Sequence, residues 1–322
     1  MYSKESFDVY VASCVETGGI YHYKLRGGKL YPVEVTPMDS PMYMVIEERK
    51  MYIVLCAPFG NEESGVVVYD IDDDGRLTNP SGIQSTHGEV GCHILVDRGE
   101  VYCANYVSGS VVKLPDRVIQ HTGHGVDPDR QEGPHVHYVG LTPDGKYICA
   151  TDLGLDTIFL YDRELNLHGR AKVPAGHGVR HLAFSEDGKW LFAANELKST
   201  VTAFSYADGR LEPVDTCSAV PADFTGETWA SAIRVKEGCV YVSNRGHDSI
   251  AKLGFAEGRL TLQETADCGG AYPRDFIFAG DYLLSTNQNG NTVTVLDSTR
   301  AFALVERTGV EAPLCVCVLE EK

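Results

Sequence analysis

The sequence GHGVRHLAFSEDGKWLFAANE, residues 176–196, decides how the rest of the chain is interpreted. Its apolar residues form two short runs, 182–185 and 190–194, on either side of the turn sequence Glu186-Asp187-Gly188-Lys189. Gly188 can adopt the positive φ that a tight hairpin turn requires. The pattern therefore predicts two antiparallel β-strands joined by a turn.

Two polar residues stand at the far ends of this hairpin. Arg180 enters the first strand and Glu196 leaves the second. Because antiparallel pairing brings these ends side by side, we expect the guanidinium and the carboxylate to be neighbours on one rim of a small sheet.

The hairpin belongs to a unit that recurs along the chain. Each unit has a Gly, Ser or Thr followed by a strand-like run, beginning at Gly19, Gly65, Ser110, Thr157, Thr200, Ser249 and Thr292. Successive starts are 43 to 49 residues apart. In five units an Asn or Asp stands five positions upstream, at Asn105, Asp152, Asn195, Asn244 and Asn287. Such side chains are expected to hydrogen-bond the turn between two strands.

Short strands in seven units of this length predict an all-β fold, a seven-bladed β-propeller. No stretch of ten residues or more shows the apolar period of a helix. The C-terminal run PLCVCVL, residues 313–319, matches the innermost-strand pattern of the last unit, whereas the first unit begins at residue 9 without such a strand. We therefore expect the C-terminal strand to complete the N-terminal blade, so that residues 1–322 form one domain. A pair of β-sandwiches is the alternative, but it does not explain the period.

Composition excludes several classes of partner. The net charge of −17 argues against binding nucleic acid or an anionic membrane, although a small anionic substrate remains compatible with it. No stretch approaches the roughly 20 apolar residues of a membrane span, and residues 1–6 lack the apolar core of a signal peptide. We expect a cytoplasmic monomer or weak homo-oligomer. Ten scattered cysteines without a CxxC pair indicate reduced thiols.

Aligning the units by their turns brings polar residues of several units to one mouth of the central channel: His137, Arg180, Glu196, Arg245, Arg274 and Gln288. The planar fork of Arg suits the oxygens of phosphate and carboxylate groups. The alternative is that these Arg side chains pair with nearby carboxylates such as Asp152 and only connect the blades.

Histidines suggest a second kind of chemistry at the same mouth. His135 and His137 stand at alternate positions of a strand, so both rings could face the channel. Such a pair could bind a metal, with His93 or His181 as a third ligand, but acid–base catalysis beside Glu196 fits better. We expect neither a metal nor a cofactor. The remaining candidates are expected to be solvated: His22, His121, His124 and His168.

Asp152 and Asp156 bracket the run DLGLD. The run lacks the further oxygen ligands of a calcium loop. We therefore expect these two carboxylates to stabilise turns near the mouth.

Three groups of motifs resemble a known family. They are His135-Val136-His137 with Thr142-Pro143-Asp144-Gly145-Lys146-Tyr147 and the DLGLD run; Val179-Arg180-His181 with Asn195-Glu196-Leu197; and Ser243-Asn244-Arg245. They look like the fourth, fifth and sixth blades of the propeller-type lactonase family, which includes the bacterial propeller-type 6-phosphogluconolactonase and the fungal 3-carboxy-cis,cis-muconate cyclase. In the cyclase branch the resemblance implies a catalytic His, two Arg and one Glu. These fall on His137 or His135, Arg180, Arg245 and Glu196.

The resemblance and the polar mouth together predict a cofactor-independent lactonase. Its first candidate substrate is 6-phosphoglucono-1,5-lactone, a step of the pentose phosphate pathway. Arg180 and Arg245 would hold anionic oxygens and the developing oxyanion, and Glu196 or His137 would move the proton. Further substrate-binding residues are predicted at Arg274, Gln288, His181 and Asp152. The alternatives are a lactonising muconate cyclase and a non-catalytic propeller that binds a peptide or protein on its faces.

Overall fold

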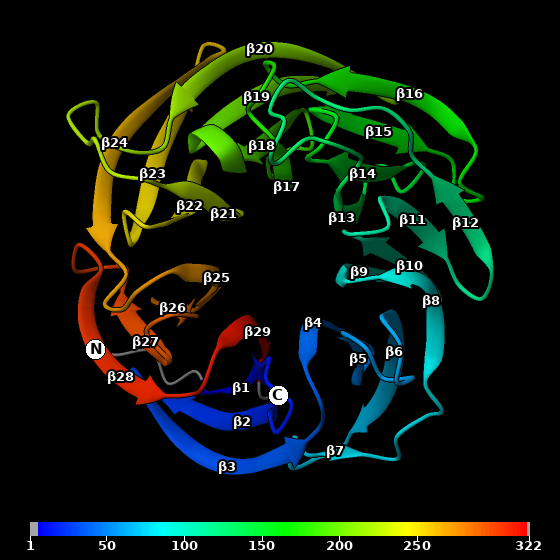
Figure 1. The fold of residues 1–322 in the computed structure, drawn as a ribbon. Helices are drawn as coiled ribbons and strands as arrows, with labels where there is room; N and C mark the ends of the chain where they lie inside the picture. The colour runs from blue at the N-terminus through cyan, green and yellow to red at the C-terminus, as the bar shows by residue number, and fades with distance from the viewer. Residues whose placement is uncertain (1–5, 321–322) are drawn as a thin grey trace.

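The strands form seven antiparallel sheets arranged in a ring (Figure 1). The computed structural model of this chain describes residues 6–320. Residues 1–5, which carry most of the stretch used for the localisation prediction, lie outside that range. Each sheet is one blade, with its first strand beside the central channel. The prediction of an all-β, seven-bladed propeller is therefore confirmed.

Within each blade the strands follow one another from the channel outward. Blade 1 has, in that order, β29 (Pro313–Glu320), β1 (Ser6–Ser13), β2 (Gly19–Arg26) and β3 (Lys29–Pro37). Blade 2 has β4 (Pro41–Glu47), β5 (Lys50–Leu55), β6 (Glu63–Ile71) and β7 (Leu77–Thr78), with β8 (Gln84–Glu89) also paired to β6. Blade 3 has β9 (Gly91–Asp97), β10 (Glu100–Asn105), β11 (Ser110–Lys113) and β12 (Arg117–Gln120).

The other four blades follow the same order. Blade 4 has β13 (Val136–Leu141), β14 (Ile148–Asp152), β15 (Thr157–Tyr161) and β16 (Leu167–Lys172). Blade 5 has β17 (Val179–Phe184), β18 (Trp190–Asn195), β19 (Thr200–Ala207) and β20 (Arg210–Ser218). Blade 6 has β21 (Trp229–Lys236), β22 (Cys239–Arg245), β23 (Ser249–Ala256) and β24 (Arg259–Asp267). Blade 7 has β25 (Pro273–Ala279), β26 (Tyr282–Asn287), β27 (Thr292–Asp297) and β28 (Ala303–Gly309).

The repeated motif of the sequence marks the third strand of each blade. Six of the predicted starts are the first residues of β2, β11, β15, β19, β23 and β27, and Gly65 lies inside β6. The upstream amides bind the turns as expected. Asn195 Nδ2 donates to Thr200 Oγ1 at 3.0 Å, and the other three asparagines of this set contact the residue five positions on: Asn105, Asn244 and Asn287.

The ring closes inside blade 1. β29 pairs with β1 in an antiparallel register that runs from Phe7 opposite Glu320 to Ser13 opposite Pro313. The buried side chains of this strand include Val316, which is 2% exposed. The predicted completion of the N-terminal blade by the C-terminal strand is thus confirmed.

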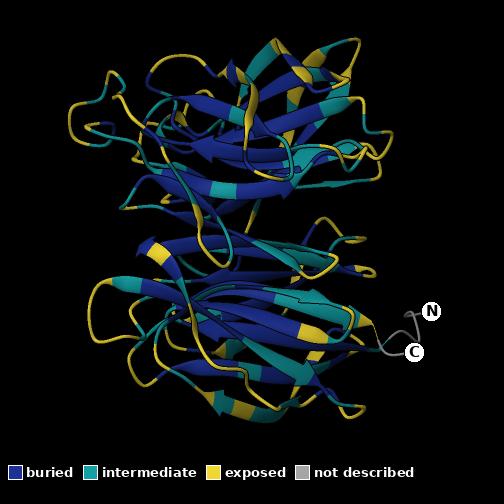
Figure 2. Ribbon diagram, turned by 90° about the vertical axis from the view of Figure 1, so that its right-hand side faces the viewer, coloured by how far each residue is buried: buried dark blue, intermediate teal, exposed yellow. Residues whose placement is uncertain are grey.

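The core consists of apolar layers between neighbouring blades. Between blades 4 and 5, for example, Ile158 and Leu160 pack in one cluster with Leu182, Leu191 and Phe204. Figure 2 shows that buried residues follow the strands and that exposed residues gather in loops and at outer edges. The only helical element in the described range is one 3₁₀ turn, η1 (Glu196–Lys198). No helix of residues 6–320 is long and apolar enough to cross a membrane.

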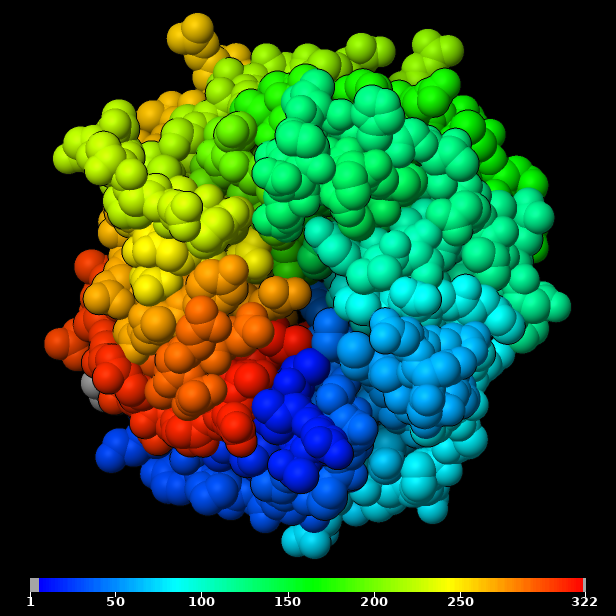
Figure 3. All heavy atoms as spheres, in the orientation of Figure 1, coloured from blue at the N-terminus to red at the C-terminus, as the bar shows by residue number. Residues whose placement is uncertain are grey.

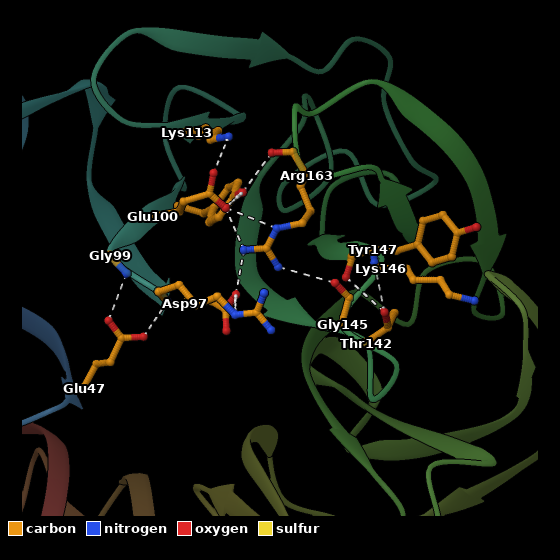
Figure 4. A network of polar contacts seen from close by, with 12 residues as sticks. Glu47, Asp97, Gly99, Glu100, Lys113, Thr142, Gly145, Lys146, Tyr147 and Arg163 are labelled. Carbon is orange, nitrogen blue, oxygen red and sulfur yellow. Dashed lines mark hydrogen bonds and ion pairs between the residues drawn. The ribbon is translucent and has the colours of Figure 1, made fainter.

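Charged residues connect blades 3 and 4 at the end of the ring away from the predicted mouth (Figure 4). Arg163, in the turn after β15, contacts Asp97 and Glu100 at 2.6 Å each. Glu100 also pairs with Lys113 at 2.8 Å. These contacts hold the turn regions of two blades together.

Two histidines predicted to be solvated are buried, so that prediction is wrong for them. His22 is 2% exposed and lies 2.5 Å from Asp8. His121 is 5% exposed because it bridges Asp152 and Tyr161, at 2.6 and 2.7 Å. Both rings face a neighbouring strand or blade and are satisfied there by a polar partner, which a search for apolar periodicity cannot detect. The other two, His124 and His168, are exposed as predicted.

Candidate active site

The hairpin that decided the fold also places the first two site residues. β17 and β18 pair with Val179 opposite Asn195, and Gly188 in the turn has φ 69°. Arg180 Nε lies 3.1 Å from Glu196 Oε2, and both side chains are buried. The sequence prediction that these two residues are neighbours is therefore confirmed.

Glu196 is bound by three guanidiniums. Besides Arg180, Arg245 Nη2 lies 2.8 Å from Oε2, and Arg130 Nη2 lies 2.7 Å from Oε1. Burial raises the pKa of Glu196, but the charges of Arg245 and Arg180 outweigh it and hold the pKa well below its usual range. The carboxylate is thus ionised at neutral pH.

Arg274 is the guanidinium of this mouth that forms no ion pair with a described residue. Within residues 6–320 no carboxylate forms an ion pair with it. Burial and the nearby charge of Arg245 lower the pKa of Arg274, which means that the site holds this positive charge at a cost. A ligand anion would remove that cost.

His137 faces the same cavity as a neutral imidazole. It is 5% exposed, and burial together with the charge of Arg180 lowers its pKa well below the ordinary value. Cys92 Sγ lies 3.8 Å from His137 Nδ1, and burial raises the pKa of this thiol to about 12. Because the cysteine stays protonated, the pair lacks the thiolate that a nucleophilic cysteine needs.

These residues surround a cavity of about 450 Å³. The space-filling view shows the centre of the ring hollowed (Figure 3). The arginine, histidine and glutamate side chains that line the cavity are Arg130, His137, Glu196, Arg245 and Arg274. Apolar, aromatic and thiol side chains complete it: Met42, Val90, Cys92, Tyr106, Val107, Trp229 and Tyr272. The cavity therefore offers positive charge beside surface suited to the carbon face of a small organic anion.

Arg180 and His181 lie one layer below this cavity. Neither lines it, and both line a narrow space deeper in the channel. His181 Nε2 is 3.2 Å from Arg180 Nη1, and its ring centroid is 5.3 Å from that of His137. These two residues support the cavity from beneath.

Three other predicted site residues also lie outside the cavity lining. His135 stacks on Tyr106 with ring centroids 4.6 Å apart and contacts Glu132. Gln288 follows β26 and donates its backbone N–H to Tyr272 O at 3.0 Å. Asp152 is fully buried, and the protein itself occupies its carboxylate.

Asp152 is a structural residue of the mouth. Its Oδ1 accepts the backbone N–H groups of His135 and Leu155, and its Oδ2 binds His121. Asp156 accepts the backbone N–H groups of two glycines, Gly176 and Gly178, at 2.7 Å each. The expected turn-stabilising role of the DLGLD run is confirmed, whereas no oxygen of Asp152 is left to bind a substrate.

Sequence reasoning missed Arg130. This residue lies in the long connection between β12 and β13, residues 121–135, outside the aligned positions of the repeat. The available signal was the length of this connection, because long loops in compact folds are commonly functional.

Metal ligands do not gather here. Within the part of the chain that the structure describes, no group of three or more His, Cys, Asp or Glu side chains is arranged to hold a metal ion. The ring of His181 packs against those of His93 and His137 through aromatic contacts instead.

Comparison with known proteins identifies the family. Residues 8–320 match the family described as "Lactonase, 7-bladed beta-propeller". The chain belongs to this lactonase family. It is 33% identical to the 6-phosphogluconolactonase of Bacillus subtilis over 345 aligned positions, covering 97% of this chain and 98% of that protein. The lactonase family and this relative support a hydrolase.

Two solved structures superpose on nearly the whole chain. A Lactobacillus plantarum protein gives a TM-score of 0.89 at 27% identity, covering 98% of this chain and 99% of that one. The periplasmic gluconolactonase of Pseudomonas aeruginosa gives 0.88 at 26% identity, with the same coverage of 98% and 99%.

Proposed function

We propose that this lactonase hydrolyses a small anionic sugar lactone, 6-phosphoglucono-1,5-lactone, to 6-phosphogluconate. The observation that carries the proposal is that Arg274, which forms no ion pair within the described residues, shares one cavity with the ionised Glu196 and the neutral His137. The name of the Bacillus subtilis relative supports this choice of substrate. It implies a place in the pentose phosphate pathway.

Arg245 and Arg274 bind the substrate's oxygens in this proposal. Both line the cavity, which supports a role in which their N–H groups bind the lactone carbonyl oxygen and stabilise the charge that develops on it. Arg180 does not line the cavity, and we assign it to holding Glu196 rather than touching the substrate. The guanidinium of Arg245 also lies over the ring of Tyr272, 5.3 Å from its centroid, which fixes its direction.

Glu196 moves the proton. A water molecule attacks the lactone carbonyl carbon and gives one proton to the carboxylate of Glu196. The tetrahedral intermediate then breaks its bond to the ring oxygen, which receives that proton and becomes a hydroxyl group. The new carboxylic acid releases its own proton to solvent. His137, as a neutral imidazole, has one lone pair and one N–H with which to orient the water.

The test is an assay of purified, chelator-treated protein with a panel of ring compounds. The panel contains freshly made 6-phosphoglucono-1,5-lactone, glucono-1,5-lactone and 3-carboxy-cis,cis-muconate. Spontaneous hydrolysis is subtracted, and Arg210→Ala, an exposed Arg outside the cavity, serves as a control variant. We expect the phosphorylated lactone to give the highest kcat/KM. Turnover of the muconate without lactone hydrolysis would identify a cyclase, and activity that depends on a divalent ion would contradict the metal-free chemistry.

A further inference from the structure

Arg130 differs from the two other guanidiniums on Glu196 in its exposure. Its side chain is 38% exposed, whereas those of Arg180 and Arg245 are 3% and 5% exposed. It lines the cavity, and its contacts there are with Glu196 Oε1 and the hydroxyl of Tyr106. A guanidinium carries five N–H donors, so Arg130 keeps donors for a ligand.

The backbone that carries Arg130 is held firmly. Gly125 N donates to Gln131 O at 2.9 Å, and Gln131 N donates to Asp127 O at 2.8 Å, which closes a compact loop. Asp127 Oδ1 accepts the N–H of Arg130, and Gln131 Nε2 donates to Leu153 O in blade 4. Arg130 can therefore exchange partners by rotating its side chain while the loop stays in place.

The position of Arg130 determines whether one oxygen of the Glu196 carboxylate is accessible from the cavity. Glu196 Oε2 is taken by Arg180 and Arg245 from within the ring. Within the described chain, Oε1 receives Arg130 as its ion-pair partner. The cation that covers Oε1 is thus also the one most exposed to an incoming substrate.

Among the described residues, the positive charges around the cavity outnumber the negative ones. Four guanidiniums surround the site, those of Arg130, Arg180, Arg245 and Arg274. Glu196 forms ion pairs with three of them, Arg130, Arg180 and Arg245. The other titratable groups that face Glu196 are His137 of β13, Cys92 of β9 and Tyr106 after β10. An anionic ligand would restore the balance, whereas a neutral ligand would not.

We propose that Arg130 recognises the anionic group of the substrate, a phosphate remote from the lactone, and that Arg130 uncovers Glu196 Oε1 when it leaves Glu196 to bind this phosphate. The inference rests on the proposed function and names the class of substrate: sugar lactones that carry a phosphate. In the free protein Arg130 covers the proton acceptor. The phosphate draws Arg130 away, and Oε1 is then free to accept the proton of the attacking water. A neutral lactone binds without moving Arg130 and turns over slowly.

The test compares wild-type protein with Arg130→Ala and Arg130→Lys on two lactones, 6-phosphoglucono-1,5-lactone and glucono-1,5-lactone. For the phosphorylated lactone we expect Arg130→Ala to lower kcat/KM by about 10- to 100-fold, the loss typical of one charged hydrogen bond, and Arg130→Lys to recover part of it. For the neutral lactone we expect kcat to rise, because Oε1 is permanently open. Arg210→Ala should leave both rates unchanged.

A merely structural role would lower both rates together, and that result overturns the proposal. A kcat of Arg130→Ala for the neutral lactone at or below the wild-type value also contradicts the covering of Oε1.

Product binding separates this inference from the proposed function, because it needs no turnover. By calorimetry, Arg130→Ala should weaken 6-phosphogluconate about 10- to 100-fold and leave gluconate unchanged. If wild-type protein hydrolyses neither lactone, the proposed function fails. Equal 6-phosphogluconate affinity in both proteins refutes the role of Arg130.

Discussion

Glu196 forms ion pairs with three arginines and is also the proposed proton acceptor. Substituting it can show which of these two roles the reaction requires. Glu196→Gln keeps the shape of the side chain and removes the proton acceptor, and we expect kcat to fall by about 10²- to 10⁴-fold. Glu186→Gln, an exposed residue in the turn of the same hairpin, is the matched control and should keep wild-type kcat. Steady-state kinetics with the phosphorylated lactone measures both.

Loss of the charge on Glu196 also leaves buried guanidiniums unpaired, which destabilises the fold. Thermal unfolding of the variant therefore has to accompany the kinetics, and Glu196→Asp serves as the second variant because it keeps the charge. A folded Glu196→Gln protein with wild-type kcat would show that the carboxylate only holds the arginines.

His137 gives a prediction about pH. Burial and Arg180 lower its pKa well below 6.5, so the ring stays neutral as pH falls through that value and protonates only in more acidic solution. NMR titration should show a His signal, absent from His137→Asn, whose midpoint lies well below 6.5. A midpoint at or above 6.5 would contradict the neutral imidazole in the mechanism.

The sequence predicted the central pair of the site because register is a local property. Arg180 and Glu196 stand at the ends of one hairpin, and once the turn at Gly188 is located, antiparallel pairing determines that they meet. Arg130 reaches Glu196 from a loop outside the repeat, and nothing in strand periodicity fixes such a contact. The sequence also did not predict that His181 lies beneath the cavity. Alternation along β17 predicts the face of the sheet on which a side chain lies, but not how deep in the channel it lies.

At the scale of elements, the polar cluster of Figure 4 allows the contribution of ion pairs between blades 3 and 4 to stability to be measured. Arg163 joins the turn after β15 to Asp97 and Glu100 of blade 3. Arg163→Ala leaves two neighbouring carboxylates facing each other, and we expect it to lower the free energy of unfolding by about 1 kcal/mol, because the cluster is partly exposed. The loss should shrink in 1 M salt, where screening is strong.

The matched control for this cluster is Arg117→Ala. Arg117 is exposed and makes longer contacts, at 3.3 and 3.4 Å, with the same turn. Urea unfolding at low and high salt measures both variants. Equal stability losses, or a loss for Arg163→Ala that salt does not change, would rule out an electrostatic connection. Activity should be unaffected, because the cluster lies at the end of the ring away from the cavity.

The strands themselves were predictable wherever turn chemistry repeats. The Asn that binds a Ser or Thr five residues on marks the connection between the second and third strands, as Asn195 and Thr200 do in blade 5. Blade 2 lacks that Asn, and its extra pairing of β8 with β6 was not predicted. The burial of His121 depends on Tyr161, 40 residues away, and contacts of this kind are set by blade packing rather than by local sequence.

At the scale of the whole molecule, residues of blades 2 to 7 line one cavity, and they meet there only if the ring is closed. β25 and β4 stand on either side of β29, and Arg274 and Met42 reach the cavity from those two neighbouring blades. Opening the ring at blade 1 would therefore disturb the site from the side of Arg274. Stability and activity should depend together on the C-terminal strand.

A single substitution on that strand tests closure. Val316 is 2% exposed between blades, and Val316→Asp would bury a charge without a partner, so we expect a loss of more than about 4 kcal/mol and failure to unfold cooperatively. Leu304→Asp makes a comparable change on β28, where the side chain is 49% exposed, and should change stability by about 0.5 kcal/mol or less.

Deleting residues 313–322 removes β29 altogether and leaves the edge of β1 unpaired, which should cause aggregation. Calorimetry and light scattering distinguish these outcomes. A truncated protein with the wild-type melting curve would show that blade 1 is stable without its innermost strand, and that closure contributes nothing to the fold or to the position of Arg274.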